Sequence, residues 1–294
     1  MKQALQDTIC PKCKHKLHVS SSHFFCPQCN KSYPVINGIP ILLNEEHSIV
    51  FENVDQRPVS SFRRWVRNLL QMTPDPQCST ATQANVKYLA AHLGPTSKLL
   101  FVGGGIHSFG NHMDKLGASM LANCINLEVA MGPIVDIVAD GHNIPFPDNY
   151  FEAIICQAVL EHTRDSKRVV AEMHRVLSPE GIVYAEVPFL YPVHMRSDFR
   201  RFTLIGIKEL FSDFEIVRNG INGAVASSFT LISINFFATL CSFNNSSLYQ
   251  LGRFVFSWLF TPLKYLDWIF CKYNTATISP SGVYFIGRKK ACLA

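Results

Sequence analysis

Apolar and polar positions alternate in a regular way through the middle of the chain. Five apolar runs, each short enough for a buried strand, begin near residues 98, 124, 135, 153 and 182. Segments with helical spacing separate them, the clearest being Asp165 to Leu177, whose apolar residues recur every three or four positions. Strands that alternate with helices are typical of a parallel sheet covered on both faces. The pattern therefore predicts an α/β domain from about residue 79.

The pattern changes after this region. Residues 221–272 are apolar and aromatic, and no charged residue lies between Arg218 and Arg253. Asn244-Asn-Ser-Ser247 divides the segment into two helix-length halves, which predicts a helical hairpin. Its length alone would permit a membrane crossing. A single crossing is disfavoured, because the last two strands expected, near 214–217 and 283–287, must lie side by side in one sheet.

The N-terminal part has a different character. Residues 1–43 are rich in Cys, Lys and His, and Lys31 to Leu43 reads as strand, Asn-Gly turn and strand. Residues 44–78 are polar and contain prolines, which predicts a linker. The expected organisation is therefore a small domain at 1–43, a linker at 44–78 and a large domain at 79–294.

Composition narrows the classes further. The chain has 294 residues, a net charge of +5 and ten cysteines. The mild basic excess is too small to indicate nucleic acid or anionic lipid as a partner. The first ten residues contain no apolar core of a signal peptide. Four clustered and six scattered cysteines favour metal binding in a reducing compartment, so a cytoplasmic location is expected.

The clustered cysteines form two Cys-Pro-x-Cys pairs. Cys10 and Cys13 are separated from Cys26 and Cys29 by twelve residues. Four thiolates at this spacing match tetrahedral zinc and leave no open coordination position, so a structural zinc is predicted. The span 10–43, with its ending Tyr-Pro-Val-Ile-Asn-Gly-Ile-Pro-Ile-Leu-Leu, resembles the small zinc-ribbon activator subunits of tRNA and protein methyltransferases.

Candidate cofactor residues follow the first strands of the large domain. Gly103 and Gly105 end the first strand and would let a ligand approach the backbone closely. Glu128 ends the second strand, about 25 residues further on, where one carboxylate can accept both hydroxyls of a ribose. Asp140 and Gly141 follow the third strand, and Gln157 ends the fourth.

These features occur in the order found in one enzyme family. After the glycine loop come Ile144-Pro-Phe-Pro-Asp148, Val159-Leu-Glu-His162 and Glu172-Met-His-Arg-Val-Leu-Ser-Pro-Glu-Gly181. Residues 99–218 thereby resemble the class I S-adenosylmethionine (SAM)-dependent methyltransferases of the type 11 group. The resemblance implies a Rossmann-like, mostly parallel sheet of seven strands with helices on both faces and an antiparallel last strand.

The same resemblance implies roles for individual residues. Gly103 and Gly105 would line the methionine part of SAM, Glu128 the ribose, and Asp140 with its neighbour Gly141 the adenine. Gln157 would face the transferred methyl group. Two positions depart from the family pattern, Phe101 in place of an acid and His107 in place of a glycine, and both affect the methionine end of the pocket.

The loop after the fifth strand is the candidate acceptor surface. Residues 187–203 contain His194, Asp198 and Arg201 among aromatic residues, and they resemble a loop of some bacterial methyltransferases of this group. Methyl transfer from a sulfonium needs alignment, exclusion of water and sometimes a base. His194 or His162 would supply that base, because histidine titrates near neutral pH. A surface loop whose charges pair with one another is the alternative.

Three functions remain open on the sequence. The first is methyl transfer to a small-molecule, lipid or glycan acceptor, with the hairpin as an apolar lid or a membrane-surface element. The second is RNA methylation, with the lysine-rich ribbon holding RNA, although the aromatic stacking platform of single-strand RNA binders is missing. The third is a binding module without catalysis. No Asn/Asp-Pro-Pro-aromatic motif follows the fourth strand, which argues against the amino groups of nucleobases as acceptors, and DNA is not expected as a partner.

Overall fold

The computed structural model describes residues 2–44, 74–75, 80–105, 113–193 and 197–290. Within these ranges eleven strands form one continuous sheet in the order β1-β2-β3-β4-β7-β6-β5-β8-β9-β11-β10. The strands are β1 (His18–Val19), β2 (His23–Cys26), β3 (Lys31–Ile36), β4 (Ile39–Leu42), β5 (Leu99–Val102), β6 (Cys124–Glu128), β7 (Ile137–Ala139), β8 (Phe151–Gln157), β9 (Leu177–Pro188), β10 (Phe214–Gly223) and β11 (Gly282–Lys289).

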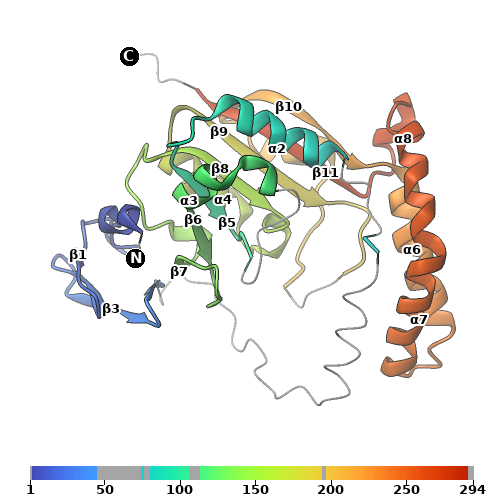
Figure 1. Cartoon of the computed structure of the whole chain (residues 1–294), viewed down its shortest axis with the longest axis horizontal. Helices are drawn as coiled ribbons and strands as arrows, with labels where there is room; N and C mark the ends of the chain where they lie inside the picture. The colour runs from blue at the N-terminus through green and yellow to red at the C-terminus, as the bar shows by residue number, and fades with distance from the viewer. Residues whose placement is uncertain (1, 45–73, 76–79, 106–112, 194–196, 291–294) are drawn as a thin grey trace.

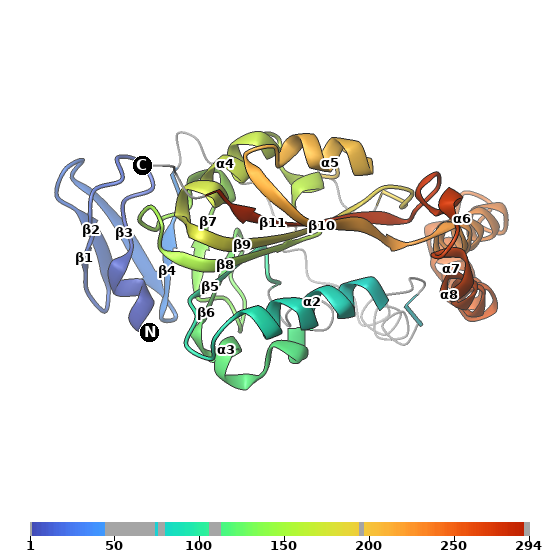
Figure 2. The same ribbon diagram turned by 90° about the horizontal axis from the view of Figure 1, so that it is seen from above.

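Helices cover both faces of the central strands (Figure 2). Two lie on one face, α2 (Thr80–His92) and α3 (Ala118–Asn123), and two on the other, α4 (Ser166–Val176) and α5 (Leu204–Leu210). The short 3-10 helices are η1 (Gln3–Asp7), η2 (Met113–Leu116), η3 (Gly141–Asn143) and η4 (Leu160–His162). The architecture is therefore the Rossmann-like α/β arrangement that the resemblance implies.

The expectation of seven strands was wrong for the sheet as a whole. The seven strands from β7 to β10 do form one contiguous part of it, with β10 at the edge, and β11 runs antiparallel to both of its neighbours. The other four come from the N-terminal region, because β4 pairs in parallel with β7, with Ile41 opposite Val138. The free edge of β7 is thereby covered by the chain's own N-terminus, which protects an otherwise unpaired strand.

The N-terminal region also shares the hydrophobic core of the sheet. Leu17, Phe24 and Tyr33 belong to the same buried cluster as Phe146 and Phe151. The predicted Asn-Gly turn is confirmed, since Asn37 and Gly38 adopt positive φ angles between β3 and β4. Two ion pairs also join the N-terminal region to the large domain: Lys2 Nζ lies 2.8 Å from Asp136, and Lys14 Nζ lies 2.8 Å from Glu172.

One boundary differs from the expectation. The sequence shows helical spacing up to Leu177 and predicts the next strand near residue 182. Instead α4 ends at Val176 and β9 begins directly at Leu177. Residues 178–181 form an irregularity in the pairing of β8 with β9, and Glu180 within it has a positive φ angle. The pairing of Leu177 with Phe151 of β8 accounts for the early start of β9, since the pairing of β9 with β11 begins only at Ile182.

The apolar segment before the last strand is helical. It contains α6 (Val225–Leu240), α7 (Ser246–Phe260), η5 (Thr261–Leu266), α8 (Asp267–Phe270) and η6 (Asn274–Thr277). α6 and α7 form an antiparallel pair that stands at the opposite end of the molecule from the N-terminal strands (Figures 1 and 2). No helix in the described part of the chain combines the length and the apolar character needed to cross a bilayer.

Candidate functional site

The glycine loop after β5 borders a cavity of about 120 Å³. Gly103 and Gly105 have φ angles of +67° and +94°, which favour glycine. A Cβ at Gly103 would lie 2.3 Å from Val159, so the close approach also requires glycine. The lining of the cavity comes from β5, the loop and the end of β8: Phe101, Val102, Gly103, Gly104, Gly105, Ile155 and Gln157.

Glu128 stands beside this loop at the end of β6. Its carboxylate accepts hydrogen bonds from Gly105 N at 2.9 Å and from Val129 N at 3.2 Å. Burial raises the pKa of Glu128, while these two backbone donors lower it. A carboxylate fixed by two backbone donors keeps further lone pairs for ligand hydroxyls. The structure therefore brings together Glu128 and the loop, as the sequence predicted.

Asp140 and Gly141 lie at the end of the neighbouring strand β7. The Asp140 carboxylate caps η3 by accepting from His142 N at 2.9 Å, and it also contacts His142 Nδ1 at 2.5 Å. Both residues therefore lie at the same edge of the sheet as Glu128, but the Asp140 side chain is buried and faces His142. A ligand at the end of β7 would therefore contact the backbone of Asp140 or neighbouring residues, and not the Asp140 carboxylate.

A buried carboxylate that the sequence analysis did not single out lies beside Gln157. Glu186, near the end of β9, accepts hydrogen bonds from Gln157 Nε2 at 3.1 Å, from Thr82 Oγ1 at 2.8 Å and from the Tyr184 hydroxyl. Burial raises the pKa of Glu186 and the three side-chain donors lower it. This network fixes the Gln157 side chain at the cavity wall. The sequence contains a signal for this network, since Glu186 is an acid within the otherwise apolar run from residue 182 to 187.

The predicted catalytic loop is only partly described. His194 falls outside the described residues, and so does His107 of the glycine loop. Asp198 and Arg201 form an ion pair through both guanidinium nitrogens, with Arg201 Nη2 at 2.7 Å from Asp198 Oδ2. Arg201 also donates to the backbone carbonyl of Tyr191 at 3.2 Å. These contacts brace the loop, which is the alternative that the sequence left open; a catalytic role of the pair stays a prediction.

Glu161 is a second buried acid, next to this braced loop. Its side chain is fully buried in η4, and among the described residues neither of its oxygens has a hydrogen-bond partner. Burial raises the pKa of Glu161 to about 7, with a further increase from Asp198 and a decrease from Arg201. His162 Nε2 lies 3.7 Å away. A carboxyl that titrates near neutral pH suits proton transfer.

We expect the raised pKa of Glu161 to make the protein less stable as pH rises. The folded state holds the proton up to about pH 7, whereas an exposed Glu releases it near pH 4.5. The folded state therefore binds more protons in this window, and stability falls by on the order of 3 kcal/mol across it. Urea unfolding at pH 5 and pH 8 should show a clearly larger loss in the wild type than in Glu161→Gln, where the remaining loss comes from other buried acids with a raised pKa, such as Glu186. An equal loss in both proteins would contradict the assignment.

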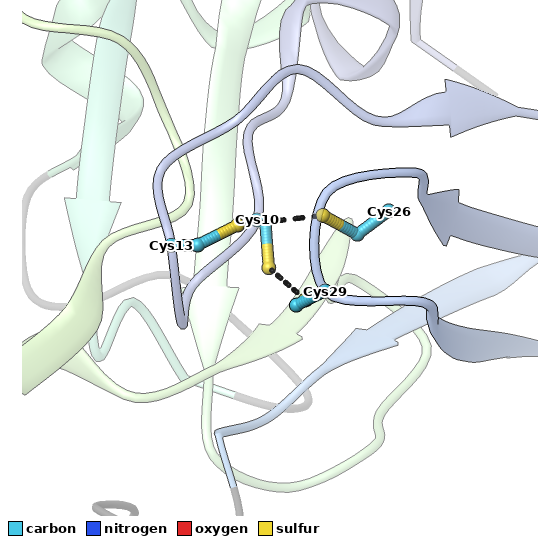
Figure 3. Close-up of side chains that lie close together, drawn as sticks. All are labelled: Cys10, Cys13, Cys26 and Cys29. Atoms are coloured by element: carbon cyan, nitrogen blue, oxygen red, sulfur yellow. Dashed lines mark hydrogen bonds between the residues drawn. The ribbon is translucent and has the colours of Figure 1, made fainter.

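The four cysteines meet in the N-terminal region. They come from two loops, and their sulfurs all lie within 4.8 Å of one another (Figure 3). Cys10 Sγ is 3.6 Å from Cys29 Sγ, and Cys13 Sγ is 3.4 Å from Cys26 Sγ. Ligands at zinc–sulfur distances of about 2.3 Å in a tetrahedron lie about 3.8 Å apart. The sulfur positions therefore fit a tetrahedral zinc.

The charges of these thiols favour the same interpretation. Burial raises the pKa of Cys10, but hydrogen bonds from Tyr33 and the backbone outweigh it and lower the value to about 7. Burial and the neighbouring thiols raise the pKa of Cys29 to about 12. One thiolate therefore forms readily at Cys10, while Cys13 and Cys29, whose pKa values are raised, resist ionisation beside it. A divalent cation would remove this mutual repulsion.

Comparison with known proteins agrees with the geometry. Residues 103–185 match the family described as "Methyltransferase domain". A glycine/sarcosine/dimethylglycine N-methyltransferase of Actinopolyspora halophila is 29% identical over 129 residues, which cover 39% of this chain and 23% of that protein. The ubiquinone/menaquinone biosynthesis C-methyltransferase UbiE of Psychromonas ingrahamii is 30% identical over 78 residues, 26% of this chain and 31% of UbiE.

A solved structure is also similar. Phosphoethanolamine N-methyltransferase 2 of Haemonchus contortus, in complex with SAM, aligns with a TM-score of 0.46 at 13% identity and covers 72% of this chain and 53% of that one. The matches to the curated relatives named above span less than a third of their length. The match agrees with the resemblance found in the sequence: residues 103–185 are similar to a methyltransferase domain.

Proposed function

We propose that the protein transfers a methyl group from SAM to a small-molecule, lipid or glycan acceptor. The observation that carries the proposal is the Glu128 carboxylate, held by Gly105 N and Val129 N beside the cavity of the glycine loop. Bound SAM would supply a methyl group that is already electrophilic. The chain has only to orient the acceptor, exclude water and take up a proton where the acceptor carries one.

Each residue around the cavity would have its own role in binding SAM or the acceptor. Gly103 and Gly105 admit the methionine part of the cofactor, and Glu128 accepts from the ribose hydroxyls. Gln157, fixed by Glu186, presents its amide at the wall where the cavity meets β8. Buried Phe101, in place of the family's acid, makes this end of the cavity apolar. Glu161 and His162 lie beside the braced loop, where Phe199 N donates to the backbone carbonyl of Glu161 at 2.8 Å and His162 Nδ1 lies 3.2 Å from the carbonyl of Ser197.

Glu128→Ala tests the proposal. Loss of the charge-assisted hydrogen bonds to the ribose should cost about 1.5–3 kcal/mol and weaken SAM binding roughly ten- to a hundredfold. Calorimetry with SAM measures the effect, and Glu209→Ala, which removes an exposed acid on α5, is the matched control. Unchanged affinity in folded Glu128→Ala would contradict the residue assignment. A wild-type protein that binds no SAM would contradict the function.

We also propose that Cys10, Cys13, Cys26 and Cys29 hold one structural zinc and complete a zinc ribbon. The fit of the four sulfurs to a tetrahedron supports this. The ribbon serves the methyltransferase domain in place, because β4 extends the sheet of that domain. Lys14, one of the lysines considered for RNA binding, is already paired with Glu172 of α4.

A further inference from the structure

The outer faces of α6 and α7 are apolar and exposed. Five side chains repeat along one stripe of α6 every three or four residues, and four do so on α7, where Leu259 adjoins the last of them. The exposed residues are Val225, Phe229, Ile232, Phe236 and Leu240 on α6, and Leu248, Leu251, Val255, Trp258 and Leu259 on α7. Phe236 and Leu240 are 60% and 62% exposed. Two parallel stripes of this size are unusual on a surface that meets water alone.

Most buried side chains of α6 are small or polar, although Phe237 of α6 also contacts the rings of Phe256 and Phe260 on α7. Leu231 and Ile234 apart, the buried side chains of α6 are Ala226, Ser227, Ser228, Thr230, Ser233 and Ala238. Gly252 of α7 packs so closely that a Cβ there would lie 3.0 Å from Ala238 Cα. The Tyr249 hydroxyl donates to Asn235 Oδ1 at 2.6 Å across the helix pair. This distribution reverses that of a water-soluble amphipathic helix and is typical of helices packed in lipid.

The charges of the segment fit an anionic surface. From residue 224 to 281 the charged residues are Arg253, Lys264, Asp267 and Lys272. Asp267 is fully buried and accepts hydrogen bonds from the first turn of α6, so every exposed charge of the segment is positive. Its exposed Trp and Tyr side chains are Trp258, Tyr265, Trp268 and Tyr273. Such rings concentrate at the headgroup level of bilayers.

We propose that the α6–α7 pair, with η5 and α8, binds the surface of an anionic lipid bilayer and inserts its apolar faces into one leaflet. α6 has 16 residues, a length of about 24 Å, which is shorter than the hydrocarbon core of about 30 Å. The connection between the helices, residues 241–245, exposes Phe243 together with Asn244 and Asn245, so the tip is of mixed character and gives no reason to prefer insertion by the tip. The pair therefore lies along the interface, as amphipathic membrane-surface helices do.

This surface adjoins the acceptor loop. Phe189 N and Leu190 N donate to the carbonyls of Ser281 and Pro280, where the helical segment returns to the sheet. The charges of Arg253 on α7 and Arg201 on the loop both act on the Tyr191 hydroxyl. Membrane binding would thus place the loop near the bilayer and favour a lipid-borne acceptor. That last step rests on the proposed methyl transfer, whereas the binding itself does not.

Flotation of the full chain with liposomes tests the proposal. We expect it to float with vesicles of phosphatidylcholine and phosphatidylglycerol, and less with phosphatidylcholine alone, because the exposed charges are basic. The double variant Phe236→Ser, Trp258→Ser should float at least about tenfold less, since two apolar side chains no longer enter the leaflet. Ile205→Ser, which removes a side chain 77% exposed on α5, is the matched control and should float like the wild type.

Each other outcome counts against the proposal. A wild type that remains at the bottom with both vesicle types overturns it. A stable dimer in light scattering that the double variant abolishes, without any flotation, would assign the face to a second copy of the chain. Loss of flotation in Ile205→Ser would indicate unspecific adhesion. SAM affinity, measured in the same preparations, should be unchanged in all variants, so failure of the methyltransferase assignment stays distinguishable.

Discussion

Cys26→Ser is expected to lose the zinc and to unfold the N-terminal strands, the largest effect that we predict. Zinc binding contributes about 10–16 kcal/mol in zinc-finger peptides, and this free energy is folding free energy. Phe24 and Tyr33 share a buried cluster with Phe146, so the loss should reach the edge of the central sheet. Metal analysis should give about one zinc per wild-type chain and almost none in the variant.

Unfolding in Cys26→Ser should be confined to the N-terminal strands and the strand that pairs with them. Amide exchange should accelerate in β1 to β4 and in β7, which loses its partner β4, and less in β8 and β9. Cys241→Ser, which changes an exposed cysteine at the end of α6, is the control and should retain the metal. A wild type purified without zinc, or a Cys26→Ser protein that keeps it, would refute the assignment. A zinc-bound water that responds to substrate would refute the structural role.

Periodicity was sufficient to predict the centre of the fold. Strands β5 to β9 and α4 follow from apolar runs and helical spacing, since each element is long enough for its period to show. The extra strands could not be predicted in the same way. Whether the ribbon is tethered or joins the sheet depends on the pairing of Ile41 with Val138, which is almost a hundred residues distant. Nothing in either segment's composition specifies that register.

In the candidate site too, features local in the sequence were predictable and long-range contacts were not. Glu128 was predicted because it ends a strand, and its bond to Gly105 N follows from the adjacency of β5 and β6. The network around Gln157 was not predictable: its partner Glu186, and Thr82, which donates to Glu186, come from distant segments. The Asp198–Arg201 pair lies within one loop, yet the sequence did not decide between bracing and catalysis, because both use the same charged residues.

Asp267→Ala is expected to detach the start of α6, the second large effect. The Asp267 carboxylate accepts from Ala224 N, Ala226 N and Ser227 N at 2.9, 2.9 and 3.0 Å, and the side chain is fully buried. The variant leaves three buried donors without a partner. At about 1 kcal/mol or more for each, the segment should lose about 3 kcal/mol of stability.

Amide exchange is the appropriate measurement for Asp267→Ala, because a hairpin at the end of the molecule can open without global unfolding. Exchange of the α6 amides should accelerate roughly a hundredfold, while β8 and β9 change little. Asp267→Asn should behave almost as badly, since one amide oxygen cannot replace two carboxylate oxygens and its NH₂ group faces donors. Asp213→Ala, at an exposed acid before β10, should leave exchange unchanged. If α6 in Asp267→Ala exchanges as in the wild type, this carboxylate does not hold the hairpin, and the membrane surface proposed above would need another anchor.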